Sequence, residues 1–336
     1  KFLHPPDQAI QWEALLDGVK IINNQDTPNP LVKKLLPAHY LSYNNTGVTT
    51  MQYWSIDHVK HRKDLSIQNA KVELANLLED AIQIRCDKKL VAATHISGGL
   101  DSGYIGSVAR KFYSHQSNFH GFSWSPLNQA DTKLEFDERT LVNDTCNHAN
   151  ITANFVDQDS CSANLSDNFS YFPNTSSYEE EFVLQKAQQN GVHLIFSGWG
   201  GDDFVSIRDS GIISDLFFSL NWRKIWKQKK RKTLRKRVAY ILYSVLLPAI
   251  KVLKPSVKKR LAEESKYLNQ EFKQHHSTAL DKIYHYRSRR HRHINFLTDH
   301  HLAKRSENWV PTGMRYGIQY RYPLLDKRLI EFMVSL

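Results

Sequence analysis

Small and acidic residues gather in a short turn whose residue types suit it to binding a phosphate group. Residues 97–102 read SGGLDS, directly after an apolar stretch and directly before a helical one. Glycine lets the backbone approach an anion closely, and the N–H groups at the start of a helix attract negative charge. The serine hydroxyls add hydrogen-bond donors. We therefore predict that this turn binds a phosphate or a pyrophosphate.

An acid within this turn points to a metal ion. Asp101 would repel a bare phosphate, so we expect a divalent cation between the two. A second turn, SGWGGDD at residues 197–203, has the same plan of strand end, small residues and then acids. Carboxylates from the two turns would share one Mg²⁺ if the fold brings the turns together. No Gly-Lys-Ser or Gly-Lys-Thr follows the first turn, which excludes a Walker-type loop.

Alternating strands and helices must position these turns. Short apolar runs predict strands in residues 89–97, 119–124 and 152–157, and a fourth strand in 193–203 that runs into the second turn. Helical periods predict helices in residues 66–86, 104–112, 137–151 and 176–192. This alternation is typical of an α/β fold with a doubly wound, mostly parallel sheet, whose ligands bind beyond the carboxyl ends of the strands. Both turns follow predicted strands. A β-hairpin is predicted in residues 36–54, and helices with loops from about residue 204 onward.

The composition of the 336 residues is that of a globular protein, with 41% hydrophobic and 11% aromatic residues. The nearest candidate for a membrane span, 238–250, is too short and contains Pro248, so no span is expected. The three cysteines are widely spaced and odd in number, which argues against a disulfide framework and favours a reducing, cytoplasmic location. The chain starts without Met and ends inside an apolar-periodic run, so we expect it to be a piece of a longer polypeptide.

The net charge of +11 comes from one segment. Residues 221–260 contain 15 Lys or Arg and no Asp or Glu, and removing these 15 cations from the net charge leaves −4. A general nucleic-acid role therefore does not follow, and none is expected. Three interpretations of the segment stay open: a solvated helix face, a docking surface for a peptide or partner protein, and attachment to an anionic membrane surface.

Together the motifs carry a family resemblance. SGGLDS resembles the pyrophosphate-binding loop of the ATP pyrophosphatase (PP-loop) superfamily. The later pieces are similar to the synthetase domain of the asparagine synthetase family: FSGWGGDD (196–203) resembles its second loop, and QYRYPLLDKRLIEF (319–332) resembles its late segment. The resemblance implies a PP-loop type α/β domain over residues 61–336 with a mostly helical part at 204–310. Residues 1–60 would be the tail of an amino-terminal glutaminase-like domain and its hinge.

The resemblance also implies ATP and Mg²⁺ as cofactors and assigns roles to matching residues. Asp101 and Asp202 would bind the metal, and Lys327 would stabilise the departing pyrophosphate, where negative charge develops. A solvated lysine at a helix start is the alternative for Lys327. The remaining residues would contact the nucleotide: Ser97, Gly98, Gly99, Asp101 and Ser102 its pyrophosphate, Ser197 and Gly198 its adenylate, and Ile96 its apolar side.

The implied reaction is amide formation through an acyl-adenylate. ATP would activate a small-molecule or peptide carboxylate, releasing pyrophosphate, and an amine or ammonia would then displace AMP. A glutamine-hydrolysing asparagine synthase is the first interpretation. A catalytically idle, nucleotide-binding interaction protein is the alternative from another class, although the acids and Lys327 argue against it.

Two departures from the family pattern bear on the substrate. The family's glutaminase nucleophile is an amino-terminal cysteine, whereas the first cysteine here is Cys86, so this chain alone is not expected to hydrolyse glutamine. Trp199 stands where asparagine synthetases carry a Glu in the second loop, and tryptophan cannot accept a proton. A large apolar side chain suits a bulky substrate, so a peptide macrolactam cyclase of the lasso-peptide type is a second enzymatic interpretation.

Overall fold

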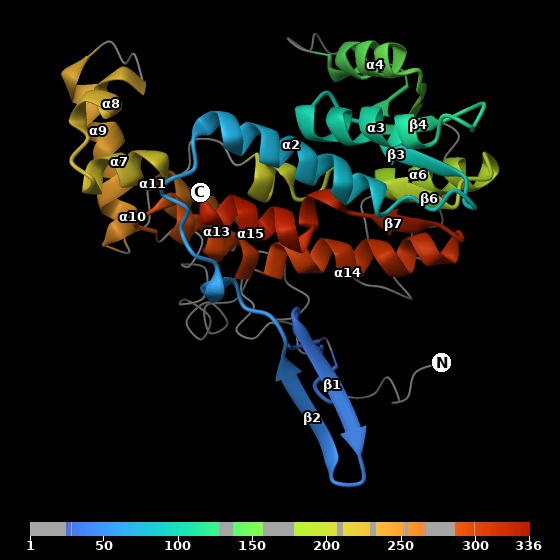
Figure 1. Ribbon diagram of the computed structural model, residues 1–336, viewed down its shortest axis with the longest axis horizontal. Helices are drawn as coiled ribbons and strands as arrows, with labels where there is room; N and C mark the ends of the chain where they lie inside the picture. The colour runs from blue at the N-terminus through green and yellow to red at the C-terminus, as the bar shows by residue number, and fades with distance from the viewer. Residues whose placement is uncertain are drawn as a thin grey trace. The chain divides into compact units, whose positions relative to one another are not determined.

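In the computed structural model, whose helices and strands are labelled in Figure 1, the chain forms two compact units. One comprises Lys1–Lys60 and Arg208–Ala303, and the other His61–Ile207 and Lys304–Leu336. The structure describes residues 25–27, 29–127, 137–156, 178–206, 211–228, 233–250, 252, 255–264, 266, 286–298 and 300–336. The predicted domain division, with residues 1–60 apart from 61–336 and a mostly helical part at 204–310, stays a prediction.

A five-stranded parallel sheet organises the unit that contains both glycine-rich turns. The strands are β3 (Ala92–His95), β4 (His120–Pro126), β5 (Thr152–Val156), β6 (Leu194–Phe196) and β7 (Gln319–Arg321), in the order β5-β4-β3-β6-β7. Every neighbouring pair is parallel. The chain moves outward from β3 to β5 and then returns to β6 on the other side of β3, so the strand order reverses between β3 and β6. The predicted α/β fold with a parallel sheet is confirmed.

Helices pack against both faces of this sheet. The helices in contact with the strands are α3 (Leu100–Phe112), α4 (Glu138–Ala149), α6 (Tyr178–Gln189) and α14 (His300–Arg315). Two further helices, α2 (Ile67–Gln83) and α15 (Lys327–Ser335), pack on each other, and α2 also packs on α3. On one face Ala93 and Ile195 pack with Val183 of α6 and Trp309 of α14. On the opposite face, where the neighbouring Thr94 points, α3 approaches β3 closely because Gly106 has no side chain. A Cβ there would lie only 2.9 Å from Thr94 Cγ2.

The sequence predicted four of the five strands and missed the fifth. β7 belongs to a stretch expected to contain only helices and loops. It is three residues long, and its partner β6 lies far earlier in the chain, so local alternation gave no signal. The helix predicted from residue 104 starts earlier, at Leu100, directly after the glycines of the first turn.

The other unit contains a hairpin and several helices. The predicted hairpin is present as β1 (His39–Asn44) and β2 (Gly47–Gln52), which pair antiparallel. The helical elements are η1 (Ile56–His58), α7 (Ile212–Phe218), α8 (Trp222–Gln228), α9 (Leu234–Ile241), η4 (Leu242–Leu246), α10 (Leu247–Ala249), α11 (Pro255–Glu264) and α13 (Arg289–Thr298). None of the helices in the described part of the chain has the length and apolarity that crossing a membrane requires.

Candidate functional site

Both glycine-rich turns lie at the same edge of the sheet, on neighbouring strands. The first turn follows β3, the second follows β6, and these two strands pair with each other. The strand order reverses between them, and ligands of open α/β sheets bind at such a reversal, beyond the carboxyl ends of the strands. The turns also touch: a Cβ on Gly198 would lie 2.9 Å from the backbone nitrogen of Ser102 and 3.0 Å from its Cα. The structure therefore joins the two predicted halves of the site.

Serine hydroxyls hold the first turn in shape. Ser102 Oγ accepts a hydrogen bond from the Ser97 backbone at 3.0 Å and lies 2.9 Å from Ser97 Oγ. Ser97 Oγ in turn accepts from the Gly99 backbone at 3.2 Å. Gly99 caps α3 and supplies no side chain to its first N–H groups. An uncapped helix start of this kind leaves backbone N–H donors that suit an anion, so the geometry is compatible with the chemistry predicted for the turn.

The side chain of Asp101, in the first turn, contacts the second turn. Its carboxylate accepts a hydrogen bond from Ser206 Oγ at 2.7 Å, and Gly201 packs so closely against it that a Cβ at Gly201 would collide with the carboxylate. Burial raises the pKa of Asp101, the Ser206 hydrogen bond opposes that shift, and the charge of Asp202 adds to it. Asp101 and Asp202 therefore interact electrostatically, as the shared-metal prediction requires.

Two carboxylates suit Mg²⁺, which needs few protein ligands, better than they suit a metal ion whose ligands all come from the protein. The described residues contain no group of three or more His, Cys, Asp or Glu able to hold a metal ion. Mg²⁺ keeps several waters and is commonly bound through one or two carboxylates together with substrate phosphates. Two acids beside an anion-binding turn match that pattern, and a bound cation would relieve their mutual repulsion.

Ile96 directly follows β3, and Ser197 directly follows β6. Ile96 is 1% exposed, and its side chain lies in the core against Gly106 and Gly121. Ser197 is also buried, and its Oγ accepts a hydrogen bond from the Trp199 backbone at 3.2 Å. The contacts predicted between these two residues and a nucleotide stay predictions.

The late segment packs against the second turn. Gly200 adopts φ +94°, and a Cβ there would lie 2.6 Å from Leu325 Cδ2, two residues before Lys327. Lys327 is the first residue of α15 and is exposed, with Nζ 3.8 Å from Glu331 Oε1. The structure thus brings the segment that carries Lys327 to the second turn, while the contact of Lys327 with pyrophosphate stays a prediction.

Asp326, which the sequence analysis did not single out, fixes the start of α15. It is 4% exposed and caps the helix by accepting from the Arg328 backbone at 2.9 Å. Arg85 Nη1 donates to its other oxygen at 2.7 Å. Burial raises the pKa of Asp326, but the hydrogen bonds from Arg328 and Arg85 outweigh this and hold it at about 2. The carboxylate is therefore ionised at neutral pH and anchors the residue next to Lys327.

The ring of Trp199 packs against a cation, the guanidinium of Arg305. The Arg305 guanidinium lies 4.2 Å from the centre of the Trp199 ring and 4.3 Å from that of Trp309. These are cation–π distances, each worth about 0.5–2 kcal/mol. The second turn is therefore tied to α14 through Arg305, a residue that no motif in the sequence indicated.

Glu180 is a buried acid next to Trp124. Glu180 is fully buried and accepts hydrogen bonds from Trp124 Nε1 at 2.7 Å and from the Tyr320 hydroxyl. His95 Nε2 lies 3.2 Å from the same carboxylate. Burial raises the pKa of Glu180, but His95 and the two donors outweigh it, so the net pKa is below its usual range. The carboxylate joins α6 to β3, β4 and β7 next to the first turn.

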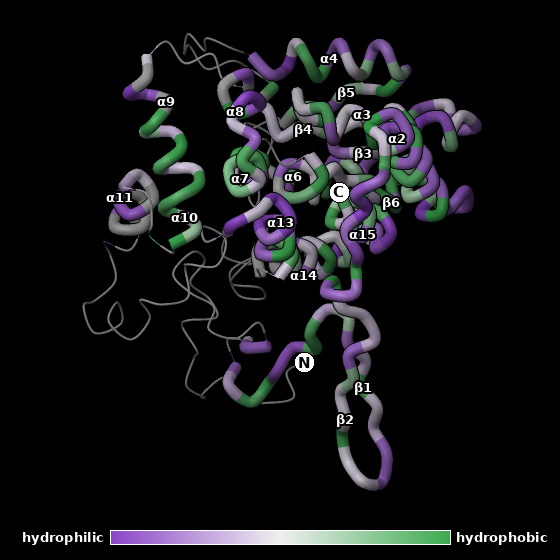
Figure 2. Tube along the Cα trace, turned by 60° about the vertical axis from the view of Figure 1, so that its left-hand side comes forward, coloured by the Kyte–Doolittle hydropathy of each residue, from purple (hydrophilic) through white to green (hydrophobic). Residues whose placement is uncertain are grey.

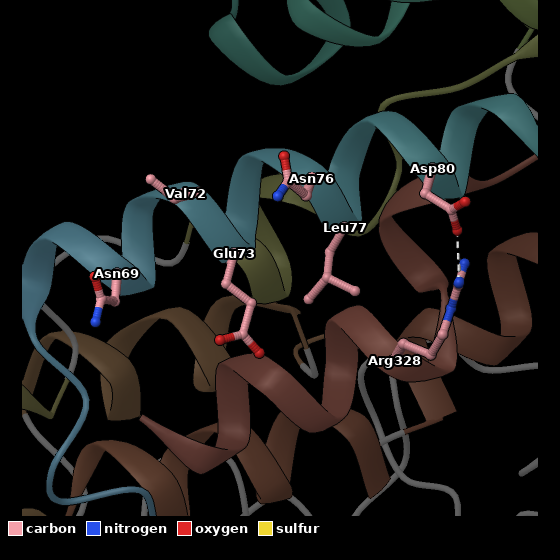
Figure 3. A pocket seen from close by; sticks show the side chains of 7 residues that line it. All are labelled: Asn69, Val72, Glu73, Asn76, Leu77, Asp80 and Arg328. Carbon is pink, nitrogen blue, oxygen red and sulfur yellow. Dashed lines mark ion pairs between the residues drawn. The ribbon is translucent and has the colours of Figure 1, made fainter.

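A separate pocket of about 480 Å³ lies between α2 and the start of α15 (Figure 3). Asn69, Val72, Glu73, Asn76, Leu77, Asp80 and Arg328 line it, and Asp80 pairs with Arg328 across one end. No residue of either glycine-rich turn takes part in its lining. We therefore place the candidate site at the turns, where the anion-binding backbone and the acids are, rather than in this pocket.

Comparison with known proteins identifies the family. The sequence model of the asparagine synthase family matches residues 73–336, a range that includes both turns and the late segment. The chain belongs to the asparagine synthase family. The predicted resemblance to the synthetase domain of this family is thereby confirmed.

Similarity to individual proteins is more limited. A stretch of 78 residues is 30% identical to the glutamine-hydrolysing asparagine synthetase 3 of Bacillus subtilis (strain 168), covering 23% of this chain and 12% of that protein. The chain thus matches only about an eighth of the length of this curated relative. The structure of a U34-tRNA thiolase, NcsA from Methanococcus maripaludis with its 4Fe–4S cluster, matches 81% of this chain and 88% of its own. The TM-score is 0.31 and the identity 12%, values too low to carry an argument.

Proposed function

We propose that this chain is an ATP-dependent, amide-forming ligase that activates a carboxylate as an acyl-adenylate. The supporting observation is the packing of Gly198 on the backbone of Ser102, which joins an anion-binding turn and two interacting acids into one site. Under this proposal the sheet is of the doubly wound PP-loop type and the cofactors are ATP and Mg²⁺. Family membership favours asparagine synthase (glutamine-hydrolysing) as the formal activity.

In the proposed reaction the first turn holds the pyrophosphate part of ATP through backbone N–H groups at the start of α3. A substrate carboxylate oxygen attacks the α-phosphorus, and the bond from that phosphorus to the bridging oxygen of pyrophosphate breaks. Lys327 stabilises the charge that develops on the leaving group. Mg²⁺, held by Asp101 and Asp202, would neutralise further charge on the phosphates. An amine or ammonia then attacks the acyl carbon, and AMP leaves.

Exchange of labelled pyrophosphate into ATP tests the first step directly. Exchange that depends on aspartate supports an asparagine synthase, and exchange that depends only on a peptide carboxylate supports a cyclase. ATP binding without exchange for any acid would instead support the idle interaction protein. Asp101→Ala should abolish exchange, whereas Asp144→Ala, an exposed acid on α4, should leave it unchanged. Full exchange in Asp101→Ala would refute the metal assignment.

A peptide macrolactam cyclase is the second candidate, and Trp199 is the observation that favours it. Its ring meets Arg305 at a position where a base for ammonia would be expected. The described cysteines Cys86 and Cys146 are free, which supports a reducing, cytoplasmic setting for either activity.

A further inference from the structure

One helical run in the unit of Lys1–Lys60 and Arg208–Ala303 is apolar on two faces. It comprises α9, η4 and α10 and extends without a break from Leu234 to Ala249. One face is covered: Val245 and Pro248 are buried, and η4 packs on α7, where Ser214 Oγ donates to the carbonyl of Ser244. This contact accounts for only part of the run's apolar surface.

The same run also carries a stripe of exposed aliphatic side chains. The stripe consists of every fourth residue, Val238, Leu242, Leu246 and Ile250, which are 57%, 40%, 38% and 64% exposed. Residues four apart lie one above another on a helix, so these side chains form one continuous strip. Among the described residues α7 packs on η4, while the side chains of the stripe stay exposed.

Cations precede and follow the stripe along the chain. Arg235 and Lys236 lie in the first turn of α9 itself, and both are exposed. Figure 2 shows the change from a hydrophilic start of α9 to a largely hydrophobic course through α10. The helices before and after the run in the sequence add exposed cations, Arg223, Lys224 and Lys227 on α8 and Lys258 and Lys259 on α11. Lys259 pairs with Glu263 of α11, whereas residues 221–260 contain no Asp or Glu.

We propose that this basic, apolar surface docks on an anionic lipid bilayer, with the stripe in the interface and the cations at the headgroups. An apolar face flanked by Lys and Arg is the pattern of helices that lie in a membrane interface. The run does not cross the bilayer, because its length of about 24 Å at 1.5 Å per residue is less than the hydrocarbon thickness of about 30 Å. A nucleic acid would match the charge but not the aliphatic stripe. The inference is independent of the proposed ligase activity.

Sedimentation with lipid vesicles tests the docking. The full chain is mixed with vesicles of phosphatidylcholine alone or with 30% phosphatidylserine, and the bound fraction is measured at low and high salt. We expect binding to the anionic vesicles only, weakened by salt. Arg235→Gln with Lys236→Gln should weaken binding about five-fold per cation. Leu242→Ser with Leu246→Ser should weaken it about twenty-fold.

Matched controls separate docking from unfolding. Ile67→Ser with Val72→Ser removes two side chains that are 78% and 54% exposed on α2, outside the stripe, and should leave binding unchanged. Thermal melting checks that all variants fold. Absence of binding to anionic vesicles at low salt would overturn the proposal. So would binding that the stripe variant leaves intact, since that is purely electrostatic adsorption. A stripe variant that alters only self-association, or only the binding of an acidic protein such as polyglutamate, would assign the surface to that partner instead.

Discussion

The start of α15 depends on one buried carboxylate, and replacing Asp326 by Asn tests how it is held. Asp326 accepts from the Arg328 backbone at 2.9 Å, from Arg328 Nε at 3.1 Å and from Arg85 at 2.7 Å. Asparagine is as good a helix cap as aspartate, so Asp326→Asn keeps the cap and removes the charge. The variant therefore isolates the interaction of the carboxylate with its two arginines.

The pKa of Asp326 sets the magnitude. It falls from an ordinary 3.8 to about 2 in the folded protein, and each unit corresponds to about 1.4 kcal/mol. Ionised Asp326 should thus contribute about 2 kcal/mol to the free energy of unfolding at neutral pH. Because the folded pKa is the lower one, this stability is complete well above pH 4 and is lost as the pH falls toward 2. About half of it, roughly 1 kcal/mol, should remain at pH 3.

Urea unfolding followed by tryptophan fluorescence at pH 7, 5, 4 and 3 measures this difference. The gap between the wild type and Asp326→Asn should be about 2 kcal/mol at pH 7 and should shrink steadily below pH 4. Asp64→Asn, an exposed acid ahead of α2, is the control and should change stability by less than about 0.5 kcal/mol. A difference in unfolding free energy that stays constant from pH 7 to pH 3 would mean that ionisation of Asp326 does not contribute to stability, and would refute the reasoning.

Three further changes test other parts of the chain. Gly198→Ala should lower pyrophosphate exchange at least about ten-fold, because its Cβ would push the two turns apart; Gly103→Ala, whose Cβ would lie 3.4 Å from Thr145 Cγ2, should leave exchange unchanged. Tyr320→Phe should lower the urea-unfolding free energy by about 1–3 kcal/mol, because buried Glu180 loses a donor, and no loss would mean that the hydroxyl is dispensable. Burial raises the pKa of Cys86 and Cys146 to about 11, which lowers the thiolate fraction at pH 8 about one hundred-fold relative to an ordinary thiol of pKa 9.0. The thiolate of higher pKa is about ten-fold more nucleophilic, so in a Cys161→Ser background a disulfide reagent should react about ten-fold more slowly than with an ordinary thiol, and a normal rate would contradict the burial argument.

The first turn was predictable from sequence because its chemistry is local. Glycines, serines and an acid within six residues, between a strand and a helix, need no distant partner to form an anion-binding helix start. The alternation of strands and helices also predicted that both turns lie at one edge of the sheet, but only the folded strand order shows that β3 and β6 are neighbours. In a parallel sheet that alternation sends all strand ends to one edge, so turns after neighbouring strands lie side by side.

Features made by distant segments were not predictable. The hydroxyl that hydrogen-bonds Asp101 belongs to Ser206, 105 positions later in the chain. Glu180 lies in a run of three glutamates at a helix start, a pattern typical of a solvated surface, yet it is fully buried. Its burial is stabilised by His95, Trp124 and Tyr320, which come from three different strands. No local sequence pattern indicates these partners, because they come together only once the sheet has formed.

Trp199 is where local and distant information combine. Sequence alone indicated that no base stands at this position of the second turn, and the structure adds a guanidinium against the ring. A glutamate there would offer a negative charge to an incoming ammonium ion, whereas Arg305 presents a positive one. Repulsion between like charges then disfavours any protonated nitrogen nucleophile beside Arg305, so the attacking amine has to lose its proton to a group other than residue 199. The pair of Trp199 and Arg305 thus bears on the second half of the proposed reaction, while the glycine-rich turns bear on the first.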